Sequence, residues 1–192
     1  MDDRPASPPA ALALIEERAR AHGFDAMCDA GVGALLRTLA RSLIGGRALE
    51  LGTGPGTSTA WILDGMAHEA TLLTIDEDAA VVGLARSVLG GDDRVTFCVG
   101  DGSQLLRELA GGTPFGLVFA DTWPGKYWDL DLALNLVAPG GFYVIDDMLP
   151  QPNWPDGHAS KVAELLDLLD ARTDLTLTRM NWSSGVVLAV RC

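Results

Sequence analysis

The sequence predicts an α/β fold: one mostly parallel sheet of seven strands, with helices on both faces and an antiparallel hairpin at one edge. From residue 47 onward, short apolar segments alternate with segments of helical periodicity, which is typical of parallel strands joined by helices. Several apolar segments end at an acidic residue or a glycine turn. The last two segments, 174–180 and 186–191, are separated by only five residues, as in a β-hairpin.

The N-terminal part is expected to be helical. A first helix is predicted over 10–22 and a second over 32–43, where leucines recur at helical spacing. The glycine pair 45–46 ends the second helix. We therefore expect a single domain with three parts, which are a flexible tail at 1–10, a helical arm at 11–46 and a core at 47–192.

In the core, each predicted strand is short and apolar, and each predicted helix has apolar residues three or four positions apart. The carboxyl ends of parallel strands meet at one edge of the sheet, where ligands bind. The predicted strands are 48–51, 71–75, 95–99, 117–120, 142–145, 174–180 and 186–191. The predicted helices are 57–66, 79–89, 105–109, 130–137 and one around 162–169.

Composition excludes several classes of protein. The 192 residues are 48% hydrophobic and 21% charged, which is typical of a folded soluble domain. No apolar run approaches the roughly 20 residues of a membrane span, and the N-terminus lacks the pattern of a secretory signal. Three distant cysteines form no disulfide framework or metal motif, so a reducing cytoplasm is expected. The net charge of −12 disfavours nucleic acid as a partner.

A glycine-rich loop follows the first predicted strand. Residues 50–59 read Glu-Leu-Gly-Thr-Gly-Pro-Gly-Thr-Ser-Thr. Glycine lets the backbone turn tightly and approach a ligand closely. The Gly-x-Gly-x-Gly spacing differs from the Gly-x-Gly-x-x-Gly of dinucleotide-binding proteins. By itself the loop is consistent with a ligand cradle or with a plain turn.

Two further strand ends carry acidic residues. Asp76 ends the second strand, 24 residues after Gly52, and an acid there either accepts the hydroxyls of a ribose or caps the next helix. Asp101, in the sequence Gly-Asp-Gly at 100–102, either reads an adenine edge or caps its own following helix. Because these strand ends converge, we expect a nucleotide-type ligand.

Together these motifs resemble those of class I S-adenosylmethionine-dependent methyltransferases. The resemblance rests on 50–56, Asp76 and 100–102, and extends to about Asp147. Within that family the chain looks most like the cation-dependent, catechol-type O-methyltransferases, through 121–127 and the Asp-Asp pair that follows a Pro-Gly-Gly turn. The resemblance implies a Rossmann-like, doubly wound sheet, S-adenosylmethionine as cofactor, and O-methylation of a small molecule.

The same resemblance implies roles for individual residues. The glycine loop would hold the methionine and ribose portion of the cofactor, Asp76 the ribose hydroxyls, and Gly102 the adenine. Trp123 would pack on the adenine face, unless it is a core or rim residue. The cofactor set implied in this way is Glu50, Gly52, Thr53, Gly54, Gly56, Ser58, Asp76, Asp101, Gly102, Asp121 and Trp123.

Three carboxylates form a candidate metal site. Asp121 and Asp146 end strands that this fold places side by side, about 4.8 Å apart, and Asp147 follows directly. Carboxylates this close raise one another's pKa unless a cation neutralises them. Mg²⁺ or another divalent cation is one solution, and it would also activate an acceptor oxygen. Neutralisation by Lys126 or by backbone amides is the other.

The sequence departs from the catechol type at Pro124. That family has a lysine at this step of the motif, where it serves as the general base, and proline cannot do so. Lys126 and His158 are the nearest candidates, since amines and imidazoles can exchange protons, and Asp121 completes the predicted catalytic set. Asn153 and Trp154 are expected to shape the acceptor pocket.

Several functions remain open. The first is O-methylation of a small molecule, for example an aromatic hydroxyl. Others are methylation of nitrogen, carbon or a macromolecule without a metal, an NAD(P)-dependent oxidoreductase, and a cofactor-binding protein without catalytic activity. No membrane partner is expected, and by family analogy the N-terminal helices would mediate a homodimer.

Overall fold

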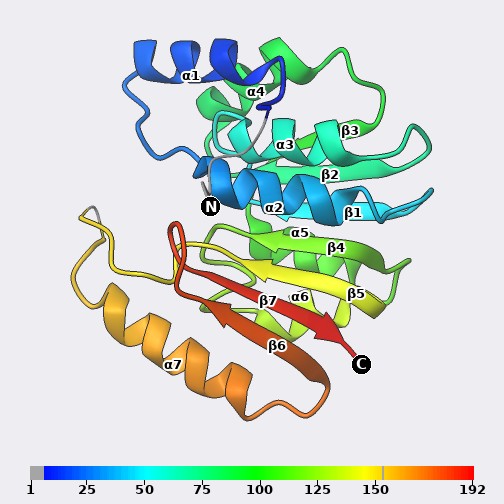
Figure 1. The fold of residues 1–192 in the computed structure, drawn as a ribbon, viewed down its shortest axis with the longest axis vertical. Coiled ribbons are helices and arrows are strands. Elements are labelled where there is room, and N and C mark those ends of the chain that lie inside the picture. Colours follow the sequence, from blue (N-terminus) through cyan, green and yellow to red (C-terminus); the bar gives the residue numbers. More distant parts are fainter. Residues whose placement is uncertain (1–6, 153) are drawn as a thin grey trace.

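The computed structural model describes residues 7–152 and 154–192. They form a seven-stranded sheet with the strand order β3-β2-β1-β4-β5-β7-β6 (Figure 1). Strands β1 to β5 are parallel, whereas β7 runs antiparallel between β5 and β6. The predicted α/β fold with its antiparallel edge hairpin is confirmed.

Every predicted strand and helix is present, with bounds that differ by a few residues at most positions. The strands are β1 Arg47–Leu51, β2 Thr71–Asp76, β3 Val95–Val99, β4 Phe115–Ala120, β5 Val137–Ile145, β6 Leu175–Met180 and β7 Val186–Arg191. The helices are α1 Leu12–Ala21, α2 Ala30–Ala40, α3 Thr57–Gly65, α4 Ala79–Leu89, α5 Gly102–Leu109, α6 Leu130–Asn135 and α7 His158–Asp170.

Several elements begin earlier than predicted, and the starts of α5 and β5 have clear structural reasons. Helix α5 begins at Gly102 because the Asp101 carboxylate accepts hydrogen bonds from the amides of Ser103 and Gln104, at 2.7 and 3.4 Å, which caps the first turn. Strand β5 begins at Val137 and continues through the Pro-Gly-Gly segment, which the sequence predicts as a turn. The strand tolerates this segment because the pairing of β4 with β5 contains a register shift there.

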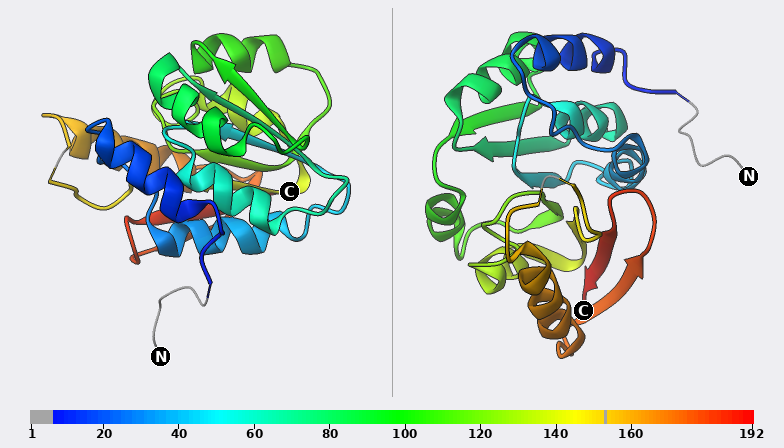
Figure 2. Two further views of the ribbon diagram at one scale, coloured as in Figure 1. Left: turned by 90° about the horizontal axis from the view of Figure 1, so that it is seen from above. Right: turned by 90° about the vertical axis from the view of Figure 1, so that its left-hand side faces the viewer.

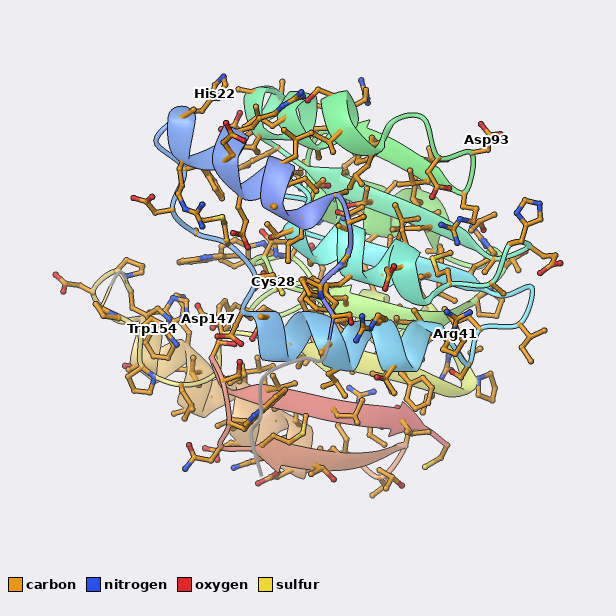
Figure 3. All side chains as sticks on the ribbon, turned by 45° about the horizontal axis from the view of Figure 1, so that its top comes forward. His22, Cys28, Arg41, Asp93, Asp147 and Trp154 are labelled. Carbon is orange, nitrogen blue, oxygen red and sulfur yellow. The ribbon has the colours of Figure 1, made fainter. Side chains whose placement is uncertain are left out.

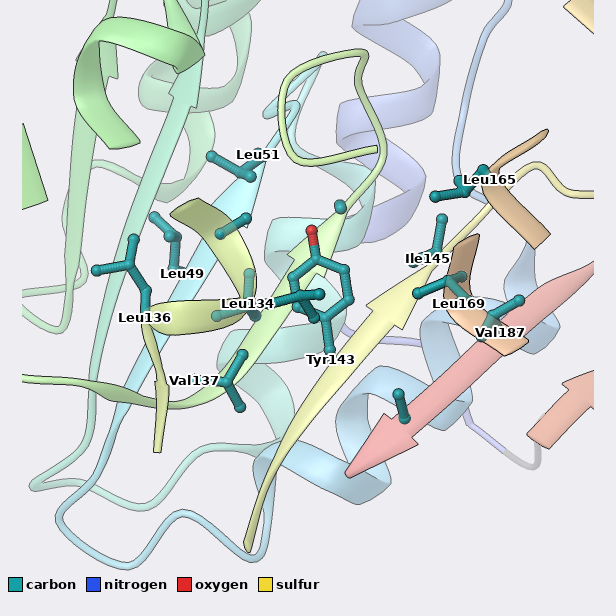
Figure 4. Close-up of a cluster of buried hydrophobic side chains, with 14 of the residues drawn as sticks. Leu49, Leu51, Leu134, Leu136, Val137, Tyr143, Ile145, Leu165, Leu169 and Val187 are labelled. Carbon is teal, nitrogen blue, oxygen red and sulfur yellow. The ribbon is translucent and has the colours of Figure 1, made fainter. Parts of the chain in front are cut away.

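Two hydrophobic clusters, one on each face, hold the helices to the sheet. Leu106 of α5, Leu134 of α6 and Leu165 of α7 belong to the cluster on one face. Figure 4 shows part of this cluster, with Leu134 beside the buried Tyr143 and Leu165 near Ile145. Helices α1 to α4 cover the other face, and Figure 2 shows both layers with the sheet between them. Burial of these apolar surfaces on both sides is the main stabilising contribution to the fold.

The arm packs closely on the core. Helix α2 lies against α3, where a Cβ on Gly33 would come within 2.3 Å of the Trp61 ring. Upstream, Pro9 is buried and an Arg37 guanidinium N–H donates to the Ser7 carbonyl at 2.5 Å. Residues 1–6 of the predicted tail lie outside the described residues. The arm therefore holds a fixed position beside the ends of the central strands.

Candidate active site

The strand order reverses between β1 and β4, and two adjoining cavities lie beyond the carboxyl ends there. Asp76 and Thr122 line both, so the two hollows meet at these residues. The larger has a volume of about 510 Å³, and its walls are Phe24, Asp25, Ala26, Met27, Cys28, Asp29, Gly52, Gly54, Asp76, Asp121, Thr122, Asp146, Asp147, Gln151, Ser183 and Ser184. The smaller has about 340 Å³, and its walls are Ile75, Asp76, Glu77, Gly100, Asp101, Gly102, Ser103, Thr122, Trp123, Pro124 and Trp128.

Two glycines of the 50–59 loop face the larger cavity. Gly52 has a φ of +103°, and a Cβ there would lie 3.0 Å from the Asp121 carbonyl oxygen. Gly54 has a φ of +50°, and a Cβ would meet only the Phe24 ring, at 3.9 Å. The Gly54 position therefore leaves open space that a ligand can fill, which is the property of a cradle.

The third glycine of the motif packs instead against a helix. A Cβ on Gly56 would lie 2.8 Å from the Cβ of Ala85 in α4, and its φ is +97°. Gly56 lines neither cavity. Its place in the sequence predicts a cofactor contact, but in the structure it allows α4 to approach the start of α3.

Glu50, Thr53 and Ser58 form a polar layer beneath the loop and do not line either cavity. Glu50 is fully buried, and the hydroxyls of Thr59 and Thr74 donate to its Oε2 at 2.6 Å each. Its other oxygen, Oε1, has no partner among the described residues. Burial raises the pKa of Glu50 to about 7, against the lowering effect of hydroxyl hydrogen bonds that include one from Ser58. These side chains support the loop, and their contact with the cofactor stays a prediction from the sequence.

Asp76 occupies the junction of the two cavities. Its Oδ2 accepts from the Gly54 amide at 2.9 Å, and its Oδ1 accepts from the Asp78 amide at 3.1 Å. Asp78, not Asp76, caps α4, by accepting from Ala80. Of the two roles open for Asp76, capping is therefore taken by another residue. Each carboxylate oxygen keeps a lone pair with which it can accept a ligand hydroxyl.

The smaller cavity has an aromatic wall. The Trp123 and Trp128 rings lie 4.9 Å apart, and Pro124 lies so close to Gly102 that a Cβ there would be 3.2 Å from the proline ring. Asp101 also lines this cavity while it caps α5. A flat heterocycle would find an aromatic surface on one side and backbone amides on the other.

Neighbouring strand ends bring the three predicted acids together. Asp121 follows β4 and Asp146 follows β5, with the Asp146 amide 3.3 Å from the Ala120 carbonyl. The Asp146 carboxylate accepts from the Asp147 amide at 2.7 Å and from the Ser184 hydroxyl. All three acids line the larger cavity.

Asp147 is held by a tryptophan. It adopts a left-handed φ of 60°, and its Oδ2 accepts from Trp154 Nε1 at 2.8 Å, so that the two side chains lie together beside the cavity (Figure 3). Trp154 thus reaches the site through Asp147. Asn153, the other loop residue expected in the pocket, lies outside the described residues.

The acids differ from ordinary surface carboxylates in their proton affinity. Burial, followed by the charge of Asp146, raises the pKa of Asp121 well above its usual value. Burial also raises the pKa of Asp146, which its hydrogen bonds partly offset. The charge of Lys126 lowers both pKa values. A carboxylate of raised pKa is a better proton acceptor near neutral pH.

The two other candidate bases lie behind the cavity wall. Lys126 is 4% exposed, and its Nζ donates to the Asp146 carbonyl oxygen at 2.7 Å. His158 is the first residue of α7, where its Nε2 lies 2.9 Å from the Tyr127 hydroxyl and its ring packs 4.3 Å from that of Trp154. Neither side chain lines a cavity. Burial also lowers the pKa of His158.

The wall formed by the arm is not predicted by the sequence motifs. Residues 24–29, between α1 and α2, close the larger cavity from the N-terminal side. Cys28 is held there by a 3.1 Å hydrogen bond from its amide to the Thr57 hydroxyl, and Asp29 caps α2 and accepts from Ser183. The available signal was the glycine break at Gly23, which ends the first predicted helix well before the second begins. Its contact with the distant 183–185 turn depends on the tertiary fold.

The acid cluster does not fit a bound divalent ion in this arrangement. Within 7–152 and 154–192, no group of three or more His, Cys, Asp or Glu side chains is placed to hold a metal. Carboxylate oxygens suit Mg²⁺ chemically. However, Asp147 is turned to Trp154, Asp146 already accepts two hydrogen bonds, and the Lys126 ammonium lies directly behind.

Comparison with known proteins identifies the family. The profile of the methyltransferase domain matches residues 49–148. A protein of Mycobacterium avium (strain 104) assigned as an O-methyltransferase is 33% identical over 193 residues, covering 95% of this chain and 86% of its own length. The chain belongs to the class I S-adenosylmethionine-dependent O-methyltransferases. The larger cavity of this methyltransferase is lined by Gly52 and Gly54 of the glycine loop of that domain.

Solved structures share the fold of the methyltransferase. The O-methyltransferase TomG of Streptomyces achromogenes, involved in tomaymycin synthesis and solved with S-adenosylmethionine, has a TM-score of 0.84 at 28% identity, covering 96% of this chain and 91% of its own. An O-methyltransferase of Bacillus cereus in complex with S-adenosylhomocysteine has a TM-score of 0.85 at 21% identity, covering 97% and 93%. Among the described residues, no helix has the length and apolar character needed to cross a bilayer.

Proposed function

We propose that this methyltransferase moves the methyl group of S-adenosylmethionine to a hydroxyl oxygen of a small molecule, with Asp121 as the proton acceptor. The observation that carries the proposal is the pair of cavities that meet at Asp76 and Thr122. One has the aromatic wall suited to an adenine, and the other has Asp121 in a wall of carboxylates. A ligand bound across the junction would have its reactive end beside Asp121.

The residues present fit the cofactor. The open space at Gly54 admits a chain close to the backbone, and Asp76 retains acceptor capacity for ribose hydroxyls. Trp123 and Gly102 offer opposing surfaces for the adenine. The cofactor supplies a methyl group already activated by a positively charged sulfur.

The chain's own residues then have to orient the acceptor and take its proton. Phe24 and Met27 cover the larger cavity from the arm side and exclude water. Asp121 lies between the glycine loop and Asp146, and its raised pKa suits it to accept the hydroxyl proton near neutral pH. The remaining task is alignment of oxygen and methyl, for which holding both in one closed cavity is the main contribution.

A pair of aspartate variants tests the cofactor site. Asp76→Ala removes the carboxylate at the junction of the two cavities. Asp78→Ala removes the cap of α4, and Asp78 lines neither cavity. Calorimetry with S-adenosylhomocysteine should show that Asp76→Ala lowers the affinity about tenfold or more, as expected for the loss of a charge-assisted hydrogen bond. Asp78→Ala should keep the affinity while lowering the Tm. Equal affinity in both variants would reject the assignment of Asp76.

An isosteric variant tests the proton acceptor. Asp121→Asn keeps the volume of the side chain and removes its basicity, so it should bind S-adenosylhomocysteine normally. Turnover of an acceptor found in a hydroxyl panel should fall about 10²-fold or more, as for loss of a general base. Unchanged turnover would assign the proton to another group. Nitrogen and carbon acceptors in the same panel, and calorimetry with NADH, test the other functions that the sequence leaves open.

Three finer points accompany this proposal, and they concern the acceptor class, the oligomeric state and the metal. An aromatic hydroxyl is favoured as acceptor because the Phe24 ring lines the larger cavity and Trp154 donates a hydrogen bond to Asp147 in its wall. A homodimer is a prediction from family analogy, checked by sedimentation of the full chain. Divalent-cation assistance, which the sequence predicts, is not part of this proposal because the acid cluster does not fit a bound ion in this arrangement, and a chelator titration of the turnover assay checks this point.

A further inference from the structure

Lys126 is placed by a turn that is fixed to the core. The Trp123 carbonyl accepts from the amides of Lys126 and Tyr127, at 3.1 and 2.9 Å. Gly125 has a φ of +84°, and a Cβ there would lie 2.6 Å from Leu51. The Tyr143 hydroxyl, directed toward the carboxyl ends of the strands (Figure 4), donates to the Gly125 carbonyl. The turn therefore has little freedom, and it directs Lys126 inward.

The inward position leaves the ammonium group among acids. Lys126 is 4% exposed, with Nζ 2.7 Å from the Asp146 carbonyl oxygen and 5.5 Å from the centre of the Tyr127 ring. A buried ammonium is costly unless negative charge compensates it. Its charge acts on both Asp121 and Asp146. The lysine and the two carboxylates therefore compensate one another.

Position 124, where the catechol-type enzymes have their basic lysine, faces elsewhere. Pro124 lines the smaller cavity and packs against Gly102. The amine of this chain comes two residues later, on the buried side of the same turn. Its ammonium contacts the Asp146 carbonyl oxygen, and Lys126 lines neither cavity.

We propose that the Lys126 ammonium is the fixed counter-cation of Asp121 and Asp146, so that no divalent cation binds at this cluster. The inference deepens the proposed function. It rests on that function only in taking the larger cavity as the place where the acceptor binds. An entering divalent ion would be repelled by the ammonium and would have to displace hydrogen bonds to Asp146 and Asp147. Lys126 is then a positioning residue, which acts through the carboxylates that line the cavity.

Titration of the full chain with Mn²⁺ tests the inference. Binding is detected by calorimetry and by the electron paramagnetic resonance signal of free Mn²⁺. Wild type and the charge-conserving Lys126→Arg should show no stoichiometric binding. Lys126→Met, which keeps most of the side-chain length without the charge, should gain one Mn²⁺ site. The double variant Lys126→Met, Asp146→Asn should lose that site again. Gain of a metal site is a readout that a purely structural lysine would not produce.

Two results overturn the inference. One is a stoichiometric Mn²⁺ site in wild type that Asp146→Asn abolishes. The other is a folded Lys126→Met protein that binds no more Mn²⁺ than wild type. Where Lys126→Met does not fold, the comparison of wild type with Asp146→Asn decides alone, and a wild type without the site supports the inference. Affinity for S-adenosylhomocysteine, measured on the same samples, reports separately on the proposed function.

Discussion

At the scale of single residues, the sequence predicts position along the backbone better than side-chain direction. Asp76 lies at the ligand-facing strand end, as its place after an apolar strand predicts. Glu50 is one residue from the end of its strand, yet it is fully buried, where the hydroxyls of Thr59 and Thr74 donate to it. A strand buried on both faces shows no alternation of polar and apolar residues. The sequence therefore does not predict that Asp76 faces the cavity and that Glu50 is buried.

The buried Glu50 predicts a pH dependence of stability. Its pKa is about 7 in the folded chain, against an ordinary value of 4.5, so between these values the folded state holds a proton that the unfolded state has lost. Stability therefore falls as pH rises through this interval and levels off above it, with a total effect of at most about 3 kcal/mol. Glu50→Gln should make this decline smaller, because only the buried Asp121 and Asp146 then contribute to it. Urea unfolding from pH ~4.5 to ~8 measures the difference.

A surface carboxylate provides the control for Glu50. Glu164→Gln on the exposed side of α7 should retain the decline seen in wild type. A Glu50→Gln protein whose stability changes with pH in parallel with wild type would show that the Glu50 proton is not involved. Loss of stability at every pH would instead indicate that the amide disrupts the hydroxyl hydrogen bonds of Thr59 and Thr74.

At the scale of elements, periodicity predicts the helices, and capping residues explain where the predictions missed. Asp101 starts α5 three residues before its first periodic leucine, and Asp29 starts α2 two residues early. In both cases an aspartate cap starts the helix before the first apolar residue of its periodic pattern. The start of β5 was missed for a different reason. Its Pro-Gly-Gly segment consists of turn residues, which are rare inside strands.

Two glycines, one in α2 and one in α4, give a matched test of helix packing. Gly33 of α2 lies where a Cβ would be 2.3 Å from the Trp61 ring, whereas Gly83 of α4 has nothing within 4 Å. Gly33→Ala should destabilise by about 1–3 kcal/mol because the helices must separate. Gly83→Ala should stabilise by about 0.5–1 kcal/mol through helix propensity alone. Chemical denaturation measures both, and a stabilising Gly33→Ala would contradict the close contact of α2 with α3.

At the scale of the whole molecule, the sheet topology makes the position of the site predictable, but contacts between distant segments make its detailed shape unpredictable. Alternating strands and helices predict one sheet whose central strand ends share a crevice, and β1 and β4 provide it. The arm wall at 24–29 and the hairpin turn at 183–185 meet across more than 150 residues of chain. Their contact fixes the shape of the acceptor space, and no local pattern encodes it.

Charge acts at the same scale. The chain carries a net charge of −12, and the larger cavity has six aspartates and no lysine or arginine among its described lining residues. S-adenosylmethionine differs from S-adenosylhomocysteine by one methyl group and one positive charge, so the ratio of their affinities isolates the electrostatic attraction. Salt screens such attraction over a Debye length of about 10 Å at ~0.1 M.

Raising the ionic strength should therefore weaken binding of S-adenosylmethionine more than binding of its neutral product. From low to high salt, we expect the affinity ratio to shift about two- to fivefold toward the product, because the attraction is partly buried and only partly screened. Competition calorimetry with the two ligands measures the ratio directly. A ratio independent of salt would mean that the carboxylates do not attract the positive sulfur, and that neighbouring cations such as Lys126 neutralise their field within the cavity.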